Sequence, residues 1–157
     1  NTSISAAILN HDDTVTVQLL EVLDGTGMAP AEIMRICGTY HAPLVMDGKG
    51  PNADLHDRLV SMTDEAGDPL IDFIAMQSAD YLAVGQAFVS GLQNKLIHHA
   101  ADAELDASAA NCARTWSGDA WRVTRRGSTG LTSPIESCML ASWGAHHLPS
   151  DGALQIF

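Results

Sequence analysis

The sequence is poor in positive charge. It has 8 Lys and Arg against 19 Asp and Glu, which gives a formal net charge of -11 over 157 residues. Phosphate polymers and anionic lipid surfaces favour Lys and Arg, so this balance argues against duplex nucleic acid and an anionic membrane surface as partners. Acidity also serves solubility, so the charge does not identify a partner.

Cysteine is scarce as well, since Cys37, Cys112 and Cys138 are the only three and lack metal-ligand spacing. Disulfide frameworks of small secreted domains are denser and usually even in number, which favours reduced thiols, although one bridge with one free thiol stays open. No signal-peptide pattern is visible. No apolar run is free enough of polar residues to span a bilayer, which takes about 20 residues. We therefore expect a protein of the cytoplasm or of a particle, with no membrane span.

The longest apolar stretch runs from Pro69 to Ala101, after Asp68 as a candidate N-cap. Its apolar residues recur at helical spacing, so it predicts one long central helix. Small residues recur in this stretch every four positions. Such rows let two helices pack closely, so we expect the row to be covered by another helix or another subunit. The row consists of Ala75, Ala79, Ala83, Ala87 and Gly91.

The rest of the chain predicts shorter elements around this helix. Residues 4–23 fit a hairpin or a loop followed by a helix, and we favour the helix because alternation fails at Leu19-Leu20. A break is expected between Ala100 and Asp106, because one helix to Trp116 would be unusually long. We also expect helices from Pro30, after Asn52 and from Ser133-Pro134-Ile135-Glu136, a strand over Ala120–Arg126, a turn at Asp47-Gly48-Lys49-Gly50, and a docking strand within the tail His146–Phe157.

These elements together predict the fold class. We expect a single domain over residues 1–157 that is mainly α, a helical bundle of five or six helices with a minor β element. A chain of this length with 46% hydrophobic residues can bury a substantial core.

Histidines suggest a metal site. His98 and Asp102 are four residues apart, a spacing that presents two ligands on one helical face, and His146 could supply a third. None of this matches a zinc motif, so hydrogen-bonded histidines remain the alternative. The sequence identifies no cofactor.

A cysteine nucleophile is a second catalytic hypothesis. Cys138 is followed by His146 or His147 as a candidate base and by Asp151 as the carboxylate that would orient it. Cys138 lies within a predicted helix, where a small buried thiol is the alternative.

Arginines concentrate in one short stretch of this acidic chain, and the turn after them carries hydroxyls. The group could bind an anion or contact an acidic neighbour, although it lacks the GxxxxGK[ST] spacing of a phosphate-binding loop. A solvated turn is the third possibility. The candidates are Arg122, Arg125, Arg126, Ser128 and Thr129.

Two classes of function follow from these observations. The small-residue row and the lack of a compact catalytic motif favour a non-catalytic structural or adaptor subunit, self-associating or bound to another protein subunit. The alternative is a small metal-dependent or cysteine hydrolase built on the histidines or on Cys138.

Overall fold

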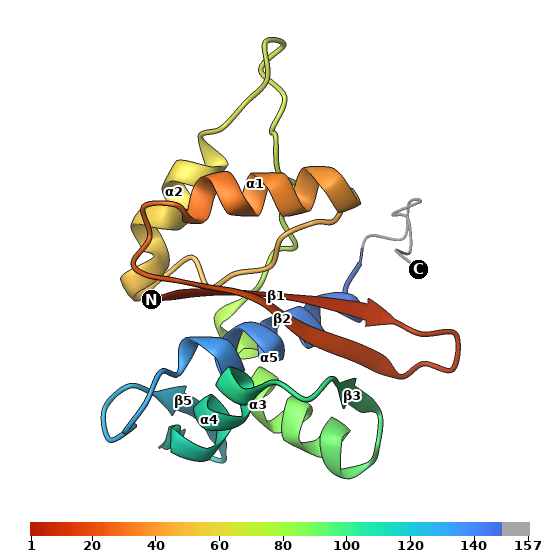
Figure 1. The fold of residues 1–157 in the computed structure, drawn as a ribbon, viewed down its shortest axis with the longest axis vertical. Helices are drawn as coiled ribbons and strands as arrows, with labels where there is room; N and C mark the ends of the chain where they lie inside the picture. Colours follow the sequence, from red (N-terminus) through yellow and green to blue (C-terminus); the bar gives the residue numbers. More distant parts are fainter. Residues whose placement is uncertain (149–157) are drawn as a thin grey trace.

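The computed structural model describes residues 1–148 and shows a mixed α/β fold (Figure 1). Our prediction of a mainly α bundle is therefore wrong. The elements in chain order are β1 (Thr2–Leu9), β2 (Val15–Leu23), α1 (Ala29–Tyr40), the short 3-10 helix η1 (Gly50–Asn52), α2 (Ala53–Val60), α3 (Ser78–Gln93), β3 (Ile97–His99), α4 (Ala103–Asn111), β4 (Ala113–Ser117), β5 (Ala120–Thr124) and α5 (Ser133–Ala145).

Residues 4–23 form a hairpin and not the helix that we favoured. Strands β1 and β2 pair antiparallel, with Ile4 opposite Glu21 and Ser5 opposite Leu19, so Leu20 is an extra residue in β2. Such a bulge exchanges the faces to which the following side chains point. The bulge explains why alternation fails at Leu19-Leu20 although the segment is a strand.

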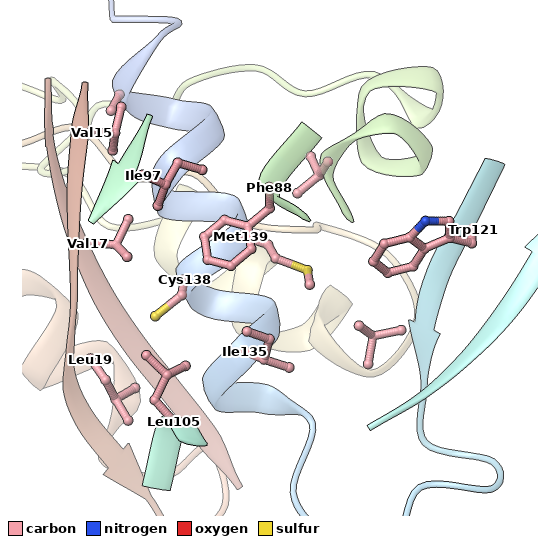
Figure 2. Packing of buried hydrophobic residues seen from close by; sticks show 13 residues of the cluster. Val15, Val17, Leu19, Phe88, Ile97, Leu105, Trp121, Ile135, Cys138 and Met139 are labelled. Atoms are coloured by element: carbon pink, nitrogen blue, oxygen red, sulfur yellow. The ribbon is translucent and has the colours of Figure 1, made fainter. Parts of the chain in front are cut away.

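The three-stranded sheet has the order β1-β2-β3, and β3 runs parallel to β2. Helices α1 and α2 lie on one side of the β1–β2 hairpin, whereas α3, α4 and α5 lie on the other (Figure 1). Two apolar clusters fill these two sides. One joins β2 and β3 to α3, α4, α5 and β5 (Figure 2), and the other joins Ile4 of β1 to α1 and α2.

The long central helix is shorter than predicted. Helix α3 covers only Ser78–Gln93, and Pro69 starts no helix because it forms a β-bridge with Thr63. Residues ahead of α3 are extended instead: Leu44 and Phe73 form a parallel bridge. The helix signal of this stretch came from apolar spacing, but Ile71 and Phe73 are apolar because they pack from an extended segment against the cluster of α1 and α2.

Several shorter elements are confirmed. The helices expected from Pro30, after Asn52 and from Ser133 are present as α1, α2 and α5, and the strand expected from Ala120 is β5. A break in the helix is present but lies earlier than the one expected between residues 100 and 106, because α3 ends at Gln93, β3 follows and α4 begins at Ala103. Sequence reasoning missed β4, which pairs antiparallel with β5 in a separate two-stranded sheet.

The docking strand expected in the tail lies largely outside the described residues. Within residues 1–148, no helix is long and apolar enough to cross a membrane.

Candidate functional site

A small hollow lies where α3, α5 and β5 meet. Its cavity volume of about 20 Å³ has room for water or a single ion but not for an organic substrate. A larger ligand would therefore contact this site from outside. The hollow is lined by Tyr81, Gly85, Arg122, Val123, Glu136 and Met139.

The first turns of α3 and α5 meet at this hollow. Tyr81 of α3 donates its hydroxyl hydrogen to Glu136 Oε1 of α5 over 3.5 Å. Ser108 fixes the start of α5, because its hydroxyl accepts from Ile135 N–H at 3.2 Å and donates to Leu131 O at 2.7 Å. Helix N-termini carry partial positive charge, so two of them at one place favour an anion there.

Strand β5 reaches the hollow because α3 has a glycine at the contact. A Cβ on Gly85 would lie 2.8 Å from the Trp121 ring, so no other residue lets the ring pack this closely without a shift. Trp121 is only 6% exposed and points into the core that Phe88 and Met139 share (Figure 2). The next residue of β5, Arg122, is thereby placed at the rim of the hollow.

Asp47, in the loop before η1, does not line the hollow, but its charge acts on Tyr81 and Glu136, which do. Leu44 N–H donates to Asp72 O at 2.7 Å and Ile74 N–H to Leu44 O at 2.8 Å, so the segments before Asp47 and before α3 run in parallel. Lys49 then ties the loop to α3, since its ammonium group donates to Ser78 Oγ at 2.6 Å. Asp47 is thus held beside the first turn of α3.

The Glu136 carboxyl has an altered proton affinity. Burial raises its pKa, and the nearby Asp47 carboxylate raises it further. Hydrogen bonds from Thr132 and Tyr81 and the charge of Arg125 act in the opposite direction without cancelling the rise. Perturbed carboxyl groups in a hollow are typical of functional sites, because they exchange protons nearer neutral pH.

Tyr81 is held in its neutral form. Burial, followed by the charges of Glu136 and Asp47, raises the pKa of its hydroxyl to about 12, and Arg122 opposes this shift. At neutral pH Tyr81 therefore remains a hydrogen-bond donor.

Sequence reasoning missed three members of this group. We took Asp47 as part of a turn and Glu136 as part of a helix start, and Tyr81 only as one of the residues at helical spacing between Pro69 and Ala101. One signal was available: Asp47 directly follows the apolar run Leu44–Met46, as expected for an acidic residue at the end of a partly buried extended segment.

The structure places two predicted arginines at the hollow. Arg122 lines it, and the charge of Arg125 acts on Glu136. Arg126 is exposed in the turn that follows β5.

The two hydroxyls proposed with these arginines serve the turn itself. Ser128 Oγ accepts from Ala113 N–H at 2.8 Å and donates to Thr124 O. Thr129 Oγ1 donates to Asn111 Oδ1 at 2.9 Å. Both residues therefore hold the turn against α4 and β4, and their role toward an anion stays a prediction.

The metal candidates are not brought together. His98 lies in β3, paired with Thr16, and its charge acts on Asp12, so the helical spacing to Asp102 does not exist. Asp102 instead caps α4, and His146 follows α5. In the part of the chain that the structure describes, no three His, Cys, Asp or Glu side chains form a group that could hold a metal ion.

The cysteine candidate is fully buried. Cys138 Sγ lies 3.3 Å from Ser5 Oγ, and burial raises the pKa of the thiol, whereas nucleophilic thiols have a lowered pKa. The His147 ring stacks on Trp143 with 3.8 Å between centroids. Asp151 lies outside the described residues, so the proposed catalytic arrangement stays untested.

The small-residue row is not continuous on one helix. Ala75 precedes α3, and Gly91 is buried because the Ile97 side chain occupies the space where a Cβ would be. The other members, Ala79, Ala83 and Ala87, are exposed. Whether they contact another subunit stays a prediction.

Comparison with known proteins finds a similarity in fold but none in sequence. No protein-family model and no curated protein sequence matches the chain. The mixed α/β fold is similar to that of a solved structure, the HK97 bacteriophage large terminase, with a TM-score of 0.60 and 11% sequence identity. The match covers 92% of this chain and 39% of the terminase chain. Our expectation of a non-catalytic structural or adaptor subunit is therefore wrong.

Proposed function

We propose that the chain is part of an enzyme of the terminase kind and that it acts on the phosphodiester backbone of nucleic acid at the hollow. The observation that carries this proposal is the fold similarity to the HK97 bacteriophage large terminase over 92% of the chain. Because the sequence lacks the GxxxxGK[ST] spacing, hydrolysis of a nucleotide at a phosphate-binding loop is not part of the proposal.

The chemistry of the hollow suits a phosphodiester. Hydrolysis needs a group that takes a proton from the attacking water, and positive groups that stabilise the charge on phosphate. Asp47 and Glu136 supply carboxyl groups for the first task. Arg122, Arg125 and the two helix N-termini suit the second.

A divalent cation would find its protein ligands here in Asp47 and Glu136. Mg²⁺ is commonly held by one or two carboxylates, with water and substrate phosphate as the other ligands. The donor set therefore fits such an ion only together with the substrate.

The acidity of the chain opposes this proposal less strongly than the net charge of -11 suggests. Half of the eight basic residues lie between Arg114 and Arg126, next to the hollow. The segment from Arg114 to Arg126 contains one carboxylate, so its own net charge is positive although that of the whole chain is negative. Our expectation that duplex nucleic acid is not a partner stays untested.

A cleavage assay tests the proposal. Single-stranded and duplex DNA would be incubated with the protein in Mg²⁺, Mn²⁺ or EDTA. We expect Asp47→Asn and Glu136→Gln each to slow cleavage by about 10²–10⁴-fold, the usual effect of removing a positioned acid or base. Asp54→Asn and Glu104→Gln change exposed carboxylates elsewhere and should retain wild-type rates. Cleavage that is absent under every condition, or equal in all variants, would refute the proposal.

A further inference from the structure

The β4–β5 hairpin carries an exposed tryptophan. Trp116 of β4 is 65% exposed, although it pairs directly with Trp121 of β5, which is 6% exposed. Paired residues of antiparallel strands share one face of the sheet. Helix α3 covers that face at β5, so β4 extends beyond the core and leaves its indole in solvent.

The same segment concentrates positive charge. Residues 113–126 contain four arginines and one carboxylate, Asp119, in a chain whose net charge is -11. The Arg114 guanidinium carbon lies 5.1 Å from the centroid of the Trp121 ring, a cation–π contact that holds this charge on the hairpin. Single exposed apolar residues are common, but a large aromatic among clustered arginines in an acidic protein is a specific combination.

We propose that the β4–β5 hairpin binds single-stranded nucleic acid, with a base stacked on Trp116 and backbone phosphates along Arg114, Arg122 and Arg125. The polymer class rests on the function proposed above. The preference for a single strand has an independent reason: an indole can stack on an unpaired base, whereas the base faces of a duplex already stack on each other.

The hairpin and the hollow share one residue. Arg122 lines the hollow and lies next to Trp121, the partner of Trp116 across the strands. Arg122 pairs with Thr115, so its side chain leaves β5 on the face opposite to Trp121, and a strand stacked on Trp116 would reach the hollow only by passing over the edge of the hairpin. The hairpin would act as the platform that positions the backbone for the proposed chemistry.

The test measures binding without cleavage. A labelled oligothymidylate of about 16 nucleotides, long enough for typical single-strand sites, is titrated in EDTA at low salt and followed by fluorescence anisotropy. We expect Trp116→Ala to weaken binding by about tenfold or more and Trp116→Phe to retain most of the affinity. Met28→Ala is the matched control, because Met28 is 70% exposed and lies outside the hairpin.

Several outcomes would overturn the inference. The first is that Trp116→Ala binds the oligothymidylate as tightly as wild type does. The second is that a duplex binds as tightly as the single strand, and the third is that no binding is detected. Cleavage with no dependence of binding on Trp116 would refute only the hairpin site, whereas Trp116-dependent binding without cleavage would refute only the proposed hydrolysis.

Discussion

The two β-hairpins of this protein share a topology but have opposite environments. The β1–β2 hairpin is covered on one face by α5 and over part of the other by α1 and α2, and Val15 and Val17 of β2 are completely buried. Hydroxyl contacts attach it to α5, with 2.6 Å between Ser5 Oγ and Ser137 Oγ. The β4–β5 hairpin is covered only along β5, and its outer strand carries arginine and an exposed tryptophan.

This difference assigns a different role to each hairpin: the β1–β2 hairpin mainly stabilises the fold, whereas the β4–β5 hairpin is available to bind a ligand. The buried hairpin contributes apolar area to two clusters, so its side chains mainly hold the fold. The exposed strand contributes little to the core, so its large aromatic residue requires another explanation. Substitutions in the two hairpins should therefore change different measurements.

A charge in the buried hairpin should have the strongest consequence. Val17→Asp places an unpaired carboxylate in the core and should cost more than about 4 kcal/mol, which is a large share of the roughly 5–15 kcal/mol that stabilise a typical domain. The matched variant Gln18→Asp changes the exposed neighbour and should stay within about 0.5 kcal/mol. Urea unfolding followed by circular dichroism measures both, and similar midpoints would contradict the placement of β2.

The tryptophan pair of the second hairpin gives an internal comparison. Trp121→Ala should lower the free energy of unfolding by about 3–5 kcal/mol, because it removes a buried ring from the core. Trp116→Ala should lower it by no more than about 0.5 kcal/mol. Denaturant titrations of the two variants test this, and equal losses would mean that Trp116 is part of a core.

The contact between β5 and α3 depends on Gly85. Gly85→Ala should cost about 1–3 kcal/mol despite the better helix propensity, because the added methyl group collides with the Trp121 ring. Gly38→Ala in α1 meets no atom within 4 Å and should stabilise the protein by about 0.5–1 kcal/mol. Thermal unfolding compares the two variants. A stabilising Gly85→Ala would show that β5 lies farther from α3.

A substitution in the hollow should change the stability of the protein by less, and by an amount that depends on pH. The pKa of Glu136 is raised in the folded state, so the folded protein binds this proton more tightly than the unfolded chain does. The resulting stabilisation is fully present below the ordinary pKa of a glutamate and is lost as the pH rises through the folded pKa. Glu136→Gln should therefore raise the melting temperature at pH 7 by roughly 2–4 °C, as about 1 kcal/mol would. The gain should shrink toward pH 4, and a gain that grows on acidification would contradict the raised pKa.

The sequence predicted helices with clear boundaries but not the architecture. Pro30, Asn52 and Ser133 mark helix starts that depend on neighbouring residues alone, and these helices are present. The stretch after Pro69 was misread because its apolar residues satisfy extended pairing with Leu44, a partner distant in sequence. The β2 bulge hid its alternation for the same reason, since it is defined only by pairing with β1.

The candidate site was predictable only in part. The arginine cluster is contiguous in sequence, and two of its members do reach the hollow. Asp47, Tyr81 and Glu136 come from three separate segments, and no spacing in the sequence connects them. Glycines gave a misleading signal, because Gly91 accommodates a side chain of the same chain and not a second subunit.

Nuclear magnetic resonance of the three tryptophan indole N–H groups compares the exposed and the buried strand of the β4–β5 hairpin with helix α5 in one titration. Trp116, Trp121 and Trp143 can be assigned by single Trp→Phe variants and followed as oligothymidylate is added in EDTA. We predict that the Trp116 signal shifts strongly while those of the buried Trp121 and half-buried Trp143 change little. A titration that leaves Trp116 unchanged, or that shifts only Trp143, would contradict nucleic-acid binding at the β4–β5 hairpin.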